Sequence, residues 1–399
     1  MSDPIIRVTD LAFPRFSAPD LDVMEKFLLD FGMQRAARTD DALYMRGTDG
    51  QHHVHVTHRG EPAFLGFAFH AASATDLRTL AAAVGGKVET LDEPGGGEVV
   101  RLTDPDGRRI DVVHGIASLP PLPVRGHEPL NTGAARVRVG SLQRVAAGPS
   151  QVKRCGHAAI KTSSLPRLWQ WYRDTLGMLV SDDMFLEGPD KPIGRFARCD
   201  KGDAPADHHT LLLVEMGEAK LGHVAWEVAD FDDLMLGHDR LAQSGARHYW
   251  GIGRHILGSQ IFDYWYDPDG FQFRVAQAVR QAAAGDVGAG HQGPFPAAGE
   301  AAREDAHVVG MVEGGETGGT QILQGPGRVE GGQDDEFPFP AEAQGRQVGA
   351  ALGRGGGDQG FVDQVHGSLL DGGSLFRGRS GAGKSGRAMQ PQASSWSWT

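Results

Sequence analysis

The sequence has few cysteines, no excess of basic residues and no long apolar run. Only two cysteines, Cys155 and Cys199, occur in 399 residues, which excludes a disulfide framework and favours a reducing cytoplasm. The formal net charge of -12 speaks against nucleic-acid binding as the main activity. No apolar run approaches the ~20 residues of a membrane span, and the N-terminus lacks the basic and apolar segments of a signal peptide. We therefore expect a soluble cytoplasmic protein with neither a membrane nor a nucleic acid as partner.

An internal duplication organises most of the chain. The turn Asp-Pro-Asp-Gly occurs at residues 104–107 and again at 267–270. In each copy a first strand leads into an amphipathic helix that ends at a Gly-Met pair, at Gly32 and at Gly177, as expected of helix C-caps. A later strand also corresponds, with Leu-Gly-Phe at 65–67 and Leu-Gly-His at 221–223. Such a repeat predicts two copies of one structural unit.

Composition divides the chain into four segments. We assign residues 1–118 to an N-terminal module, 119–152 to a linker and 153–275 to a C-terminal module. The last segment, 276–399, holds 28 of the 57 glycines and shows neither strand nor helix periodicity. Two interpretations of it stay open: a disordered tail, because it cannot bury enough apolar surface to fold, or a translation out of frame. Residues 378–385 match the phosphate-binding loop, but no strand precedes them and no helix follows, so nucleotide binding is not expected.

Histidines of the C-terminal module suggest a metal pocket. His157 opens an apolar run, His209 follows His208 in Asp-His-His-Thr, and His223 lies in Leu-Gly-His-Val. Successive side chains of a strand point to opposite faces, so we expect only one of His208 and His209 to face a pocket. Any one such histidine is more often a satisfied core or surface residue. The metal-site hypothesis therefore depends on their arrangement together.

These motifs together resemble the type I extradiol ring-cleavage dioxygenases of the vicinal oxygen chelate superfamily, to which glyoxalases and bleomycin resistance proteins also belong. The resemblance covers roughly residues 5–275 and is closest in the C-terminal module, in Asp-His-His-Thr, Leu-Gly-His, Gly253-Arg254-His255 and Phe262-Asp263-Tyr264. It implies an α+β fold of two tandem modules of paired βαβββ units, forming a partly closed mixed β-barrel around a metal pocket in the C-terminal module. The N-terminal module is expected to hold no metal, because the matching positions, Ala12 and Phe67, cannot act as ligands.

The resemblance also implies a reaction and a role for each site residue. The family cleaves a catechol-type ring beside its hydroxyl pair, using dioxygen and a non-haem Fe(II) centre, in aromatic compound catabolism, and relatives are commonly homo-oligomers. His157 and His223 match the two histidine ligands of the metal, and His209 matches the acid–base histidine that faces dioxygen. Tyr264 matches the tyrosine that hydrogen-bonds the catecholate, and His255 matches a histidine near the substrate.

One position departs from the family pattern. The third ligand of the family is a glutamate on the strand after the closing turn, and this chain has Arg274 there. A unit positive charge about 4 Å from a divalent cation costs roughly 8 kcal/mol at an effective dielectric of ~20. Glu227 shares a strand face with His223, but four residues of strand put it about 13 Å away. Two alternatives stay open: a superfamily member that binds a small aromatic without turnover, and a metalloenzyme of the glyoxalase kind.

Overall fold

The computed structural model describes residues 3–126, 131–142, 145–185, 190–255, 257–277 and 281–282, and three short strands beyond them. All of these residues belong to one compact unit, Met1–Val348. The three short strands pair antiparallel in the order β19-β20-β21, with bounds Met311–Glu313, Thr320–Pro326 and Gly345–Gln347. Most of the predicted tail, including the phosphate-loop match at 378–385, lies outside the described residues.

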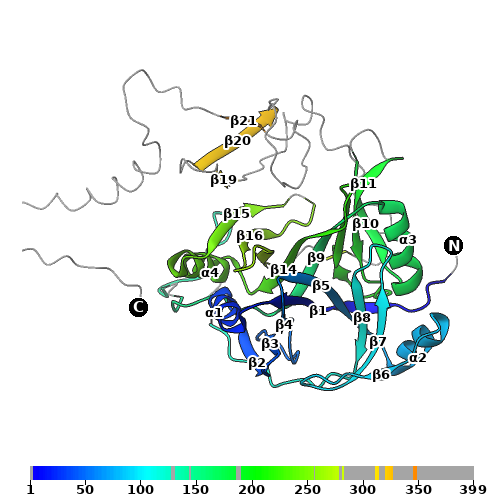
Figure 1. The fold of residues 1–399 in the computed structure, drawn as a ribbon. Coiled ribbons are helices and arrows are strands. Elements are labelled where there is room, and N and C mark those ends of the chain that lie inside the picture. The colour runs from blue at the N-terminus through cyan, green and yellow to red at the C-terminus, as the bar shows by residue number, and fades with distance from the viewer. Residues whose placement is uncertain are drawn as a thin grey trace, which may run out of the picture. The chain divides into compact units, whose positions relative to one another are not determined.

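The first sheet has eight strands in the order β2-β3-β4-β1-β5-β8-β7-β6 (Figure 1). The strands are β1 Val8–Ala18, β2 Gln34–Arg38, β3 Ala42–Arg46, β4 His55–Arg59, β5 Ala63–Ala71, β6 Glu89–Thr90, β7 Glu98–Thr103 and β8 Arg109–His114. Two helices interrupt them, α1 Leu21–Phe31 and α2 Ala74–Ala83. Chain order therefore gives β1-α1-β2-β3-β4 and then β5-α2-β6-β7-β8, which are two βαβββ units joined through the β1–β5 pair.

The second sheet repeats this topology in the order β10-β11-β13-β9-β14-β17-β16-β15. Its strands are β9 Arg154–Thr162, β10 Leu179–Phe185, β11 Pro192–Arg198, β13 Leu211–Glu215, β14 Lys220–Val228, β15 Arg247–Arg254, β16 Ile261–Tyr266 and β17 Gln272–Gln277, with helices α3 Leu165–Leu176 and α4 Phe231–Ser244. A two-residue strand, β12 Ala206–Asp207, pairs with β18 Gln281–Ala282. Parallel and antiparallel pairs occur in both sheets. The predicted α+β fold of tandem paired βαβββ units is confirmed.

Helix boundaries follow the capping residues of the sequence. The Asp20 side chain accepts hydrogen bonds from the backbone at the start of α1, and Gly32 ends the helix at a φ of 112°. That φ lies in the left-handed region, where glycine is the least strained residue. A Cβ at Gly32 would also stand 2.1 Å from the Ser150 carbonyl oxygen. Gly177 ends α3 in the same way, at a φ of 71°.

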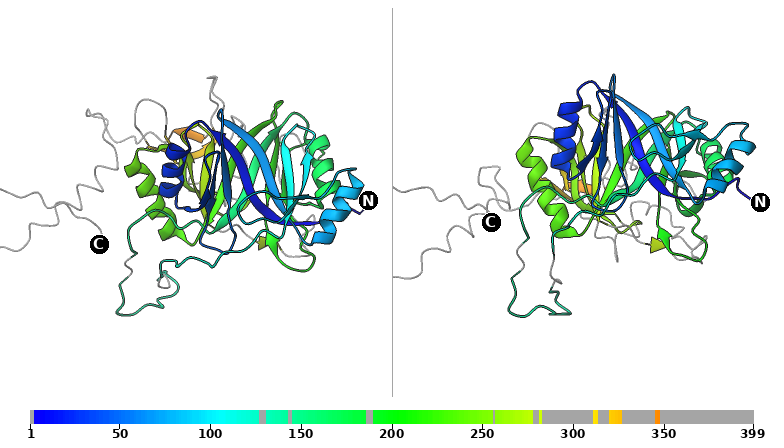
Figure 2. Two further views of the ribbon diagram at one scale, coloured as in Figure 1. Left: turned by 60° about the horizontal axis from the view of Figure 1, so that its bottom comes forward. Right: turned by 90° about the horizontal axis from the view of Figure 1, so that it is seen from below.

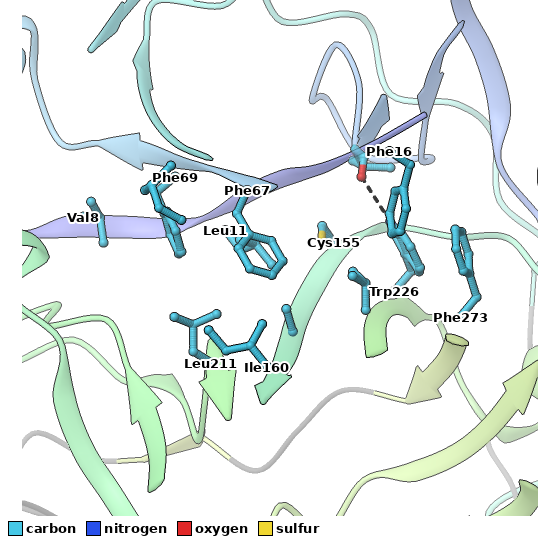
Figure 3. Packing of buried hydrophobic residues seen from close by; sticks show 14 of the residues in the cluster. Val8, Leu11, Phe16, Phe67, Phe69, Cys155, Ile160, Leu211, Trp226 and Phe273 are labelled. Atoms are coloured by element: carbon cyan, nitrogen blue, oxygen red, sulfur yellow. Dashed lines mark hydrogen bonds between the residues drawn. The ribbon is translucent and has the colours of Figure 1, made fainter. Parts of the chain in front are cut away.

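The main core lies between the two sheets and takes side chains from both (Figure 3). Phe16 of β1 and Phe273 of β17 have ring centroids 5.4 Å apart, and Trp226 of β14 stacks on Phe273 at 4.7 Å. Trp226 also donates its indole N–H to the Val54 carbonyl oxygen at 3.1 Å. Helix α1 lies beside α4 (Figures 1 and 2). The two sheets therefore share one apolar core, which fixes the strands that carry the site residues.

The described residues of the predicted linker 119–152 contain neither helix nor strand. Among the helices that the structure describes, none has the length and apolarity needed to cross a membrane.

Candidate active site

His157 and His223 converge on one point from adjacent strands. In the antiparallel pair β9–β14, His157 is opposite Ala225 and His223 is opposite Ala159, so the two histidines are diagonal neighbours on one face. Their Nε2 atoms are 3.4 Å apart, and both residues are buried. The distance is within the roughly 5 Å that two imidazoles sharing one metal ion can span.

His209 joins this pair from the segment between β12 and β13. Its ring centroid lies 4.3 Å from that of His157. The prediction that His208 and His209 are alternating strand residues is wrong, because they occupy an irregular segment and both are buried. Their Nδ1 atoms are in contact at 3.0 Å, and His208 Nε2 donates to the Asp182 carboxylate at 2.5 Å. Asp182 therefore fixes the orientation of His208, and His208 in turn limits that of His209.

Tyr264 and His255 form a hydrogen-bonded pair on the other side of His223. The Tyr264 hydroxyl and His255 Nε2 are 3.1 Å apart, and the ring centroids of Tyr264 and His223 are 5.1 Å apart. Tyr264 is buried on β16, whereas His255 follows the end of β15 and is partly exposed. The five predicted site residues are thus brought together in the second sheet, namely His157, His209, His223, His255 and Tyr264.

Arg274 occupies the middle of this group. It lies on β17 opposite Tyr264 of β16 and Ala225 of β14, and only 1% of its surface is exposed. Its Nη1 donates to His157 Nε2 at 3.0 Å, and its guanidinium carbon lies 5.1 Å from the Tyr264 ring centroid. Its Nε and Nη2 atoms are buried and have no hydrogen-bond partner among the described residues.

The electrostatic environment keeps the histidines neutral. Burial lowers the pKa of His157, His209 and His223 well below its ordinary value, and the nearby Arg274 charge lowers the pKa further. Burial and the same charge lower the pKa of His255. Burial raises the pKa of Tyr264 despite Arg274. The site therefore presents neutral imidazoles and a neutral phenol around one buried cation.

This donor set does not fit an Fe(II) ion. The His157 lone pair that would face a metal already accepts the Arg274 hydrogen bond. Among the described residues, no carboxylate joins His157 and His223 in a ligand group. Glu227 instead pairs with Arg154 at 2.6 Å, and Glu215 accepts the Leu165 backbone N–H at 2.7 Å. The two histidine positions of the family are present, and the third position carries the wrong charge.

Strand pairing identifies the positions of the first sheet that are equivalent to the site residues. Strand pairing places Phe13 opposite Ala68, and Ala68 opposite Asp111. In the second sheet, His157 is opposite Ala225, and Ala225 is opposite Arg274 in the same way. The residues equivalent to His157 and His223 are therefore Phe13 and Gly66, which corrects the predicted match with Ala12 and Phe67. Neither can ligate a metal, so the expectation of a metal-free first half is unchanged.

Two features of the site escaped the sequence analysis. The contact between His208 and Asp182 joins residues that are 26 positions apart in the sequence, and no local sequence pattern predicts it. A second His-His pair, His52-His53, precedes β4 as His208-His209 precedes β13, with Nδ1 atoms 3.1 Å apart. This repeat was visible in the sequence and extends the internal duplication to the edge of the site.

Comparison with known proteins agrees with this architecture. The model of the Glyoxalase/Bleomycin resistance protein/Dioxygenase superfamily matches residues 154–275. Metapyrocatechase 2 of Cupriavidus necator is 31% identical over 260 residues, which are 63% of this chain and 75% of that protein. A Mn(II)-bound glyoxalase from Novosphingobium aromaticivorans is 25% identical, with a TM-score of 0.55 over 69% of this chain and 84% of its own.

The homoprotocatechuate 2,3-dioxygenase of Brevibacterium fuscum, in complex with 3,4-dihydroxyphenylacetate, superimposes with a TM-score of 0.57. The match covers 70% of this chain and 84% of that one at 18% identity, and it establishes the fold alone. The similarity to the metapyrocatechase establishes the family of this chain, because the two sequences are 31% identical and the chain covers 75% of that protein. The chain belongs to the extradiol ring-cleavage dioxygenases, a family of enzymes in the glyoxalase/bleomycin resistance/dioxygenase superfamily.

Proposed function

We propose that the protein acts on a catechol-type aromatic ring at the site formed by His157, His209, His223, His255 and Tyr264. The arrangement of these residues suits extradiol ring cleavage, with dioxygen as co-substrate and Fe(II) as the metal that the reaction needs, once a carboxylate replaces Arg274. The observation that supports this most is the convergence of His157 and His223, with Nε2 atoms 3.4 Å apart, beside His209 and Tyr264. The likeness to a metapyrocatechase supports the same substrate class.

The residues around the substrate position have separate tasks. Tyr264, hydrogen-bonded to His255, presents a hydroxyl that can donate to a phenolate oxygen of the substrate. His209, held through His208 by Asp182, is placed to take or return a proton at a reacting oxygen. The surrounding burial excludes water and strengthens both interactions.

Arg274 sets a condition on this function. Because it occupies the third-ligand position and engages His157, the chain as written is not expected to load iron. The same contact favours a second candidate function, the binding of a small aromatic without cleavage. The buried guanidinium would then attract the ionised hydroxyl of a catechol, since an unpaired buried cation is stabilised by an anion.

A glyoxalase-like site is less well supported. Ligands from both halves would require a donor at Phe13, Gly66 or Asp111. Phe13 and Gly66 supply none, and the Asp111 carboxylate is held by Arg15 and Arg109. The location of the protein in a reducing cytoplasm and its assembly into a homo-oligomer remain predictions.

The test is iron stoichiometry after anaerobic reconstitution with ferrous iron. We would compare the chain as written, Arg274→Glu, and the neutral control Arg274→Gln. We expect about one iron per chain only in Arg274→Glu, because it removes the cation and supplies a carboxylate. Arg274→Gln removes the charge and adds no ionised oxygen, so it should load poorly. Dioxygen uptake with catechols should then appear in Arg274→Glu alone.

The outcomes separate the candidates. Full iron loading in the chain as written would mean that the third ligand lies elsewhere. Catechol binding to the iron-free chain, measured by calorimetry and weakened several-fold by Tyr264→Phe, would support the binding function. Failure of every variant to load iron or bind a catechol would refute both candidates.

A further inference from the structure

A second group of metal-ligating side chains lies on the opposite face of the strand that carries Tyr264. Asp263 precedes Tyr264 on β16, so their side chains point to opposite faces of the sheet. His238 Nδ1 of α4 lies 3.1 Å from Asp263 Oδ2, and His248 Nε2 of β15 lies 2.9 Å from Asp263 Oδ1. Side chains from two other elements, α4 and β15, thus converge on this carboxylate of β16.

From this geometry we propose that His238, His248 and Asp263 form a binding site for a divalent transition-metal ion, with zinc as the ion of choice. The proposal is independent of the reaction at Tyr264. Among the residues that the structure describes, this is the one group whose ligand atoms all lie within 4.8 Å of one another. Two imidazoles and a carboxylate, with the fourth position left to water, are a donor set that zinc accepts.

The distances from the two histidines to the carboxylate suit a tetrahedral ion. Zinc bonds of about 2.0–2.2 Å imply ligand atoms roughly 3.3 Å apart. The two histidine-to-carboxylate distances, 3.1 and 2.9 Å, need to lengthen by only a few tenths of an ångström. The ring planes of His238 and His248 are 82° apart, with centroids 5.2 Å from one another, so the rings do not block each other.

The surroundings hold the carboxylate in place. Trp265 donates its indole N–H to Asp263 Oδ2, as residues behind a metal ligand commonly do. A Cβ at Gly251 would lie 2.9 Å from Asp263 Oδ1, so glycine leaves the space beside the carboxylate open. Asp263 is 1% exposed, whereas the side chains of His238 and His248 are 28% and 16% exposed. An ion can therefore enter on the histidine side and reach a buried carboxylate.

Occupancy of this site would tie α4 to the β15–β16 hairpin. The other face of that hairpin carries Tyr264, and His255 follows β15 directly. A bound ion would therefore restrain the two residues that form the 3.1 Å hydrogen bond in the candidate active site. The role is one of positioning, because no ligand of the ion touches the substrate position.

The experiment measures tightly bound zinc in the full chain after metal stripping, addition of zinc chloride and gel filtration. All proteins carry His223→Gln, which removes the other convergent histidine pair. We expect about one zinc per chain in this background and in the control His114→Ala, a half-buried histidine of β8. His238→Ala and His248→Ala should each bind zinc at least ~10-fold more weakly. Cobalt bound in place of zinc should show the absorption of a tetrahedral ion.

A rescue variant distinguishes a ligand from a residue needed for the fold. His248→Cys should retain zinc, because a thiolate is also a zinc ligand, whereas a structural ion pair with Asp263 would not be restored. Zinc should also raise the urea midpoint of the background protein and leave that of His248→Ala unchanged. The proposal is wrong if the background protein binds no zinc, or if His238→Ala and His248→Ala bind zinc as it does.

Discussion

Replacing Asp267 by asparagine should stabilise the protein at neutral pH. Asp267 begins the closing turn of the second sheet, and its Oδ1 accepts the backbone N–H groups of Asp269 and Phe271 at 3.0 and 2.8 Å. Its Oδ2 is buried and has no hydrogen-bond partner among the described residues. Burial raises the pKa of Asp267 from 3.8 to about 7. Asparagine keeps the accepting oxygen and removes the group that is difficult to ionise.

The size and sign of the effect follow from this pKa. In the unfolded chain Asp267 ionises near pH 3.8, whereas in the folded chain it ionises only near pH 7. The folded state therefore binds more protons between these values, and stability is lost as the pH rises through that window. A shift of about three units corresponds to ~4 kcal/mol at most, at 1.36 kcal/mol per unit. Asp267→Asn should match the original protein near pH 4 and exceed it by a few kcal/mol above pH 7.

The equivalent turn of the first sheet provides a matched control. Asp104 makes the same backbone contacts, but its Oδ2 accepts from Arg108 Nη1 at 2.9 Å and lies 3.3 Å from the Tyr172 hydroxyl. Arg108 corresponds to Phe271 in the second turn, which explains why Asp267 has no such partner. Asp104→Asn breaks a buried ion pair and should destabilise the protein by about 3 kcal/mol.

Urea midpoints measured between pH 4.5 and pH 8 test both substitutions. The reasoning about Asp267 would be refuted if the stability difference between Asp267→Asn and the original protein stayed constant over this range. Equal effects of the two asparagine substitutions would show that the Arg108 contact does not distinguish the turns.

Two further predictions concern packing between the sheets. Phe273→Ala should cost about 3–5 kcal/mol, because this fully buried ring contacts aromatic rings from both sheets; a urea titration measures it, and Phe273→Leu should cost clearly less. Gly47→Ala should destabilise by about 1–3 kcal/mol, since its Cβ would stand 2.0 Å from the Lys153 carbonyl oxygen. Gly126→Ala, with open space at its Cβ, is the control, and equal melting temperatures of the two glycine variants would contradict the packing argument.

The sequence predicted those features that depend on local chemistry. Gly32 ends α1 and Gly177 ends α3, because left-handed glycines act within a few residues. The two Asp-Pro-Asp-Gly turns, which also depend on local chemistry, correctly predicted the duplicated topology. The convergence of His157 and His223 followed from the resemblance and could not be derived from spacing, since 66 residues separate them.

Register between strands was the feature that the sequence could not supply. Letter-by-letter alignment of Leu-Gly-Phe with Leu-Gly-His matched Phe67 to His223, whereas strand pairing matches Gly66 to His223. The two sheets have equivalent register shifts, between Arg15 and Phe16 in the first and between Leu221 and His223 in the second. The extra residue of this bulge is Leu65 in the first sheet and Gly222 in the second, so the Leu-Gly letters of the two motifs are offset by one strand position. Alignment of motifs therefore places a residue on the correct strand without fixing which face it occupies.

The two halves differ in whether the position of the third ligand is available to a metal. The second sheet has histidines at two ligand positions and Arg274 at the third, whereas the first sheet has a carboxylate, Asp111, at the position equivalent to Arg274. That carboxylate accepts from Arg15 at 2.9 Å and from Arg109 at 2.7 Å, and both Arg15 and Asp111 are fully buried. Restoring histidines in the first sheet would therefore not free Asp111 for a metal. In the second sheet no such ion pair holds Arg274, because two of its nitrogens are unpartnered among the described residues. A single substitution is consequently more able to create a metal site in the second sheet than in the first.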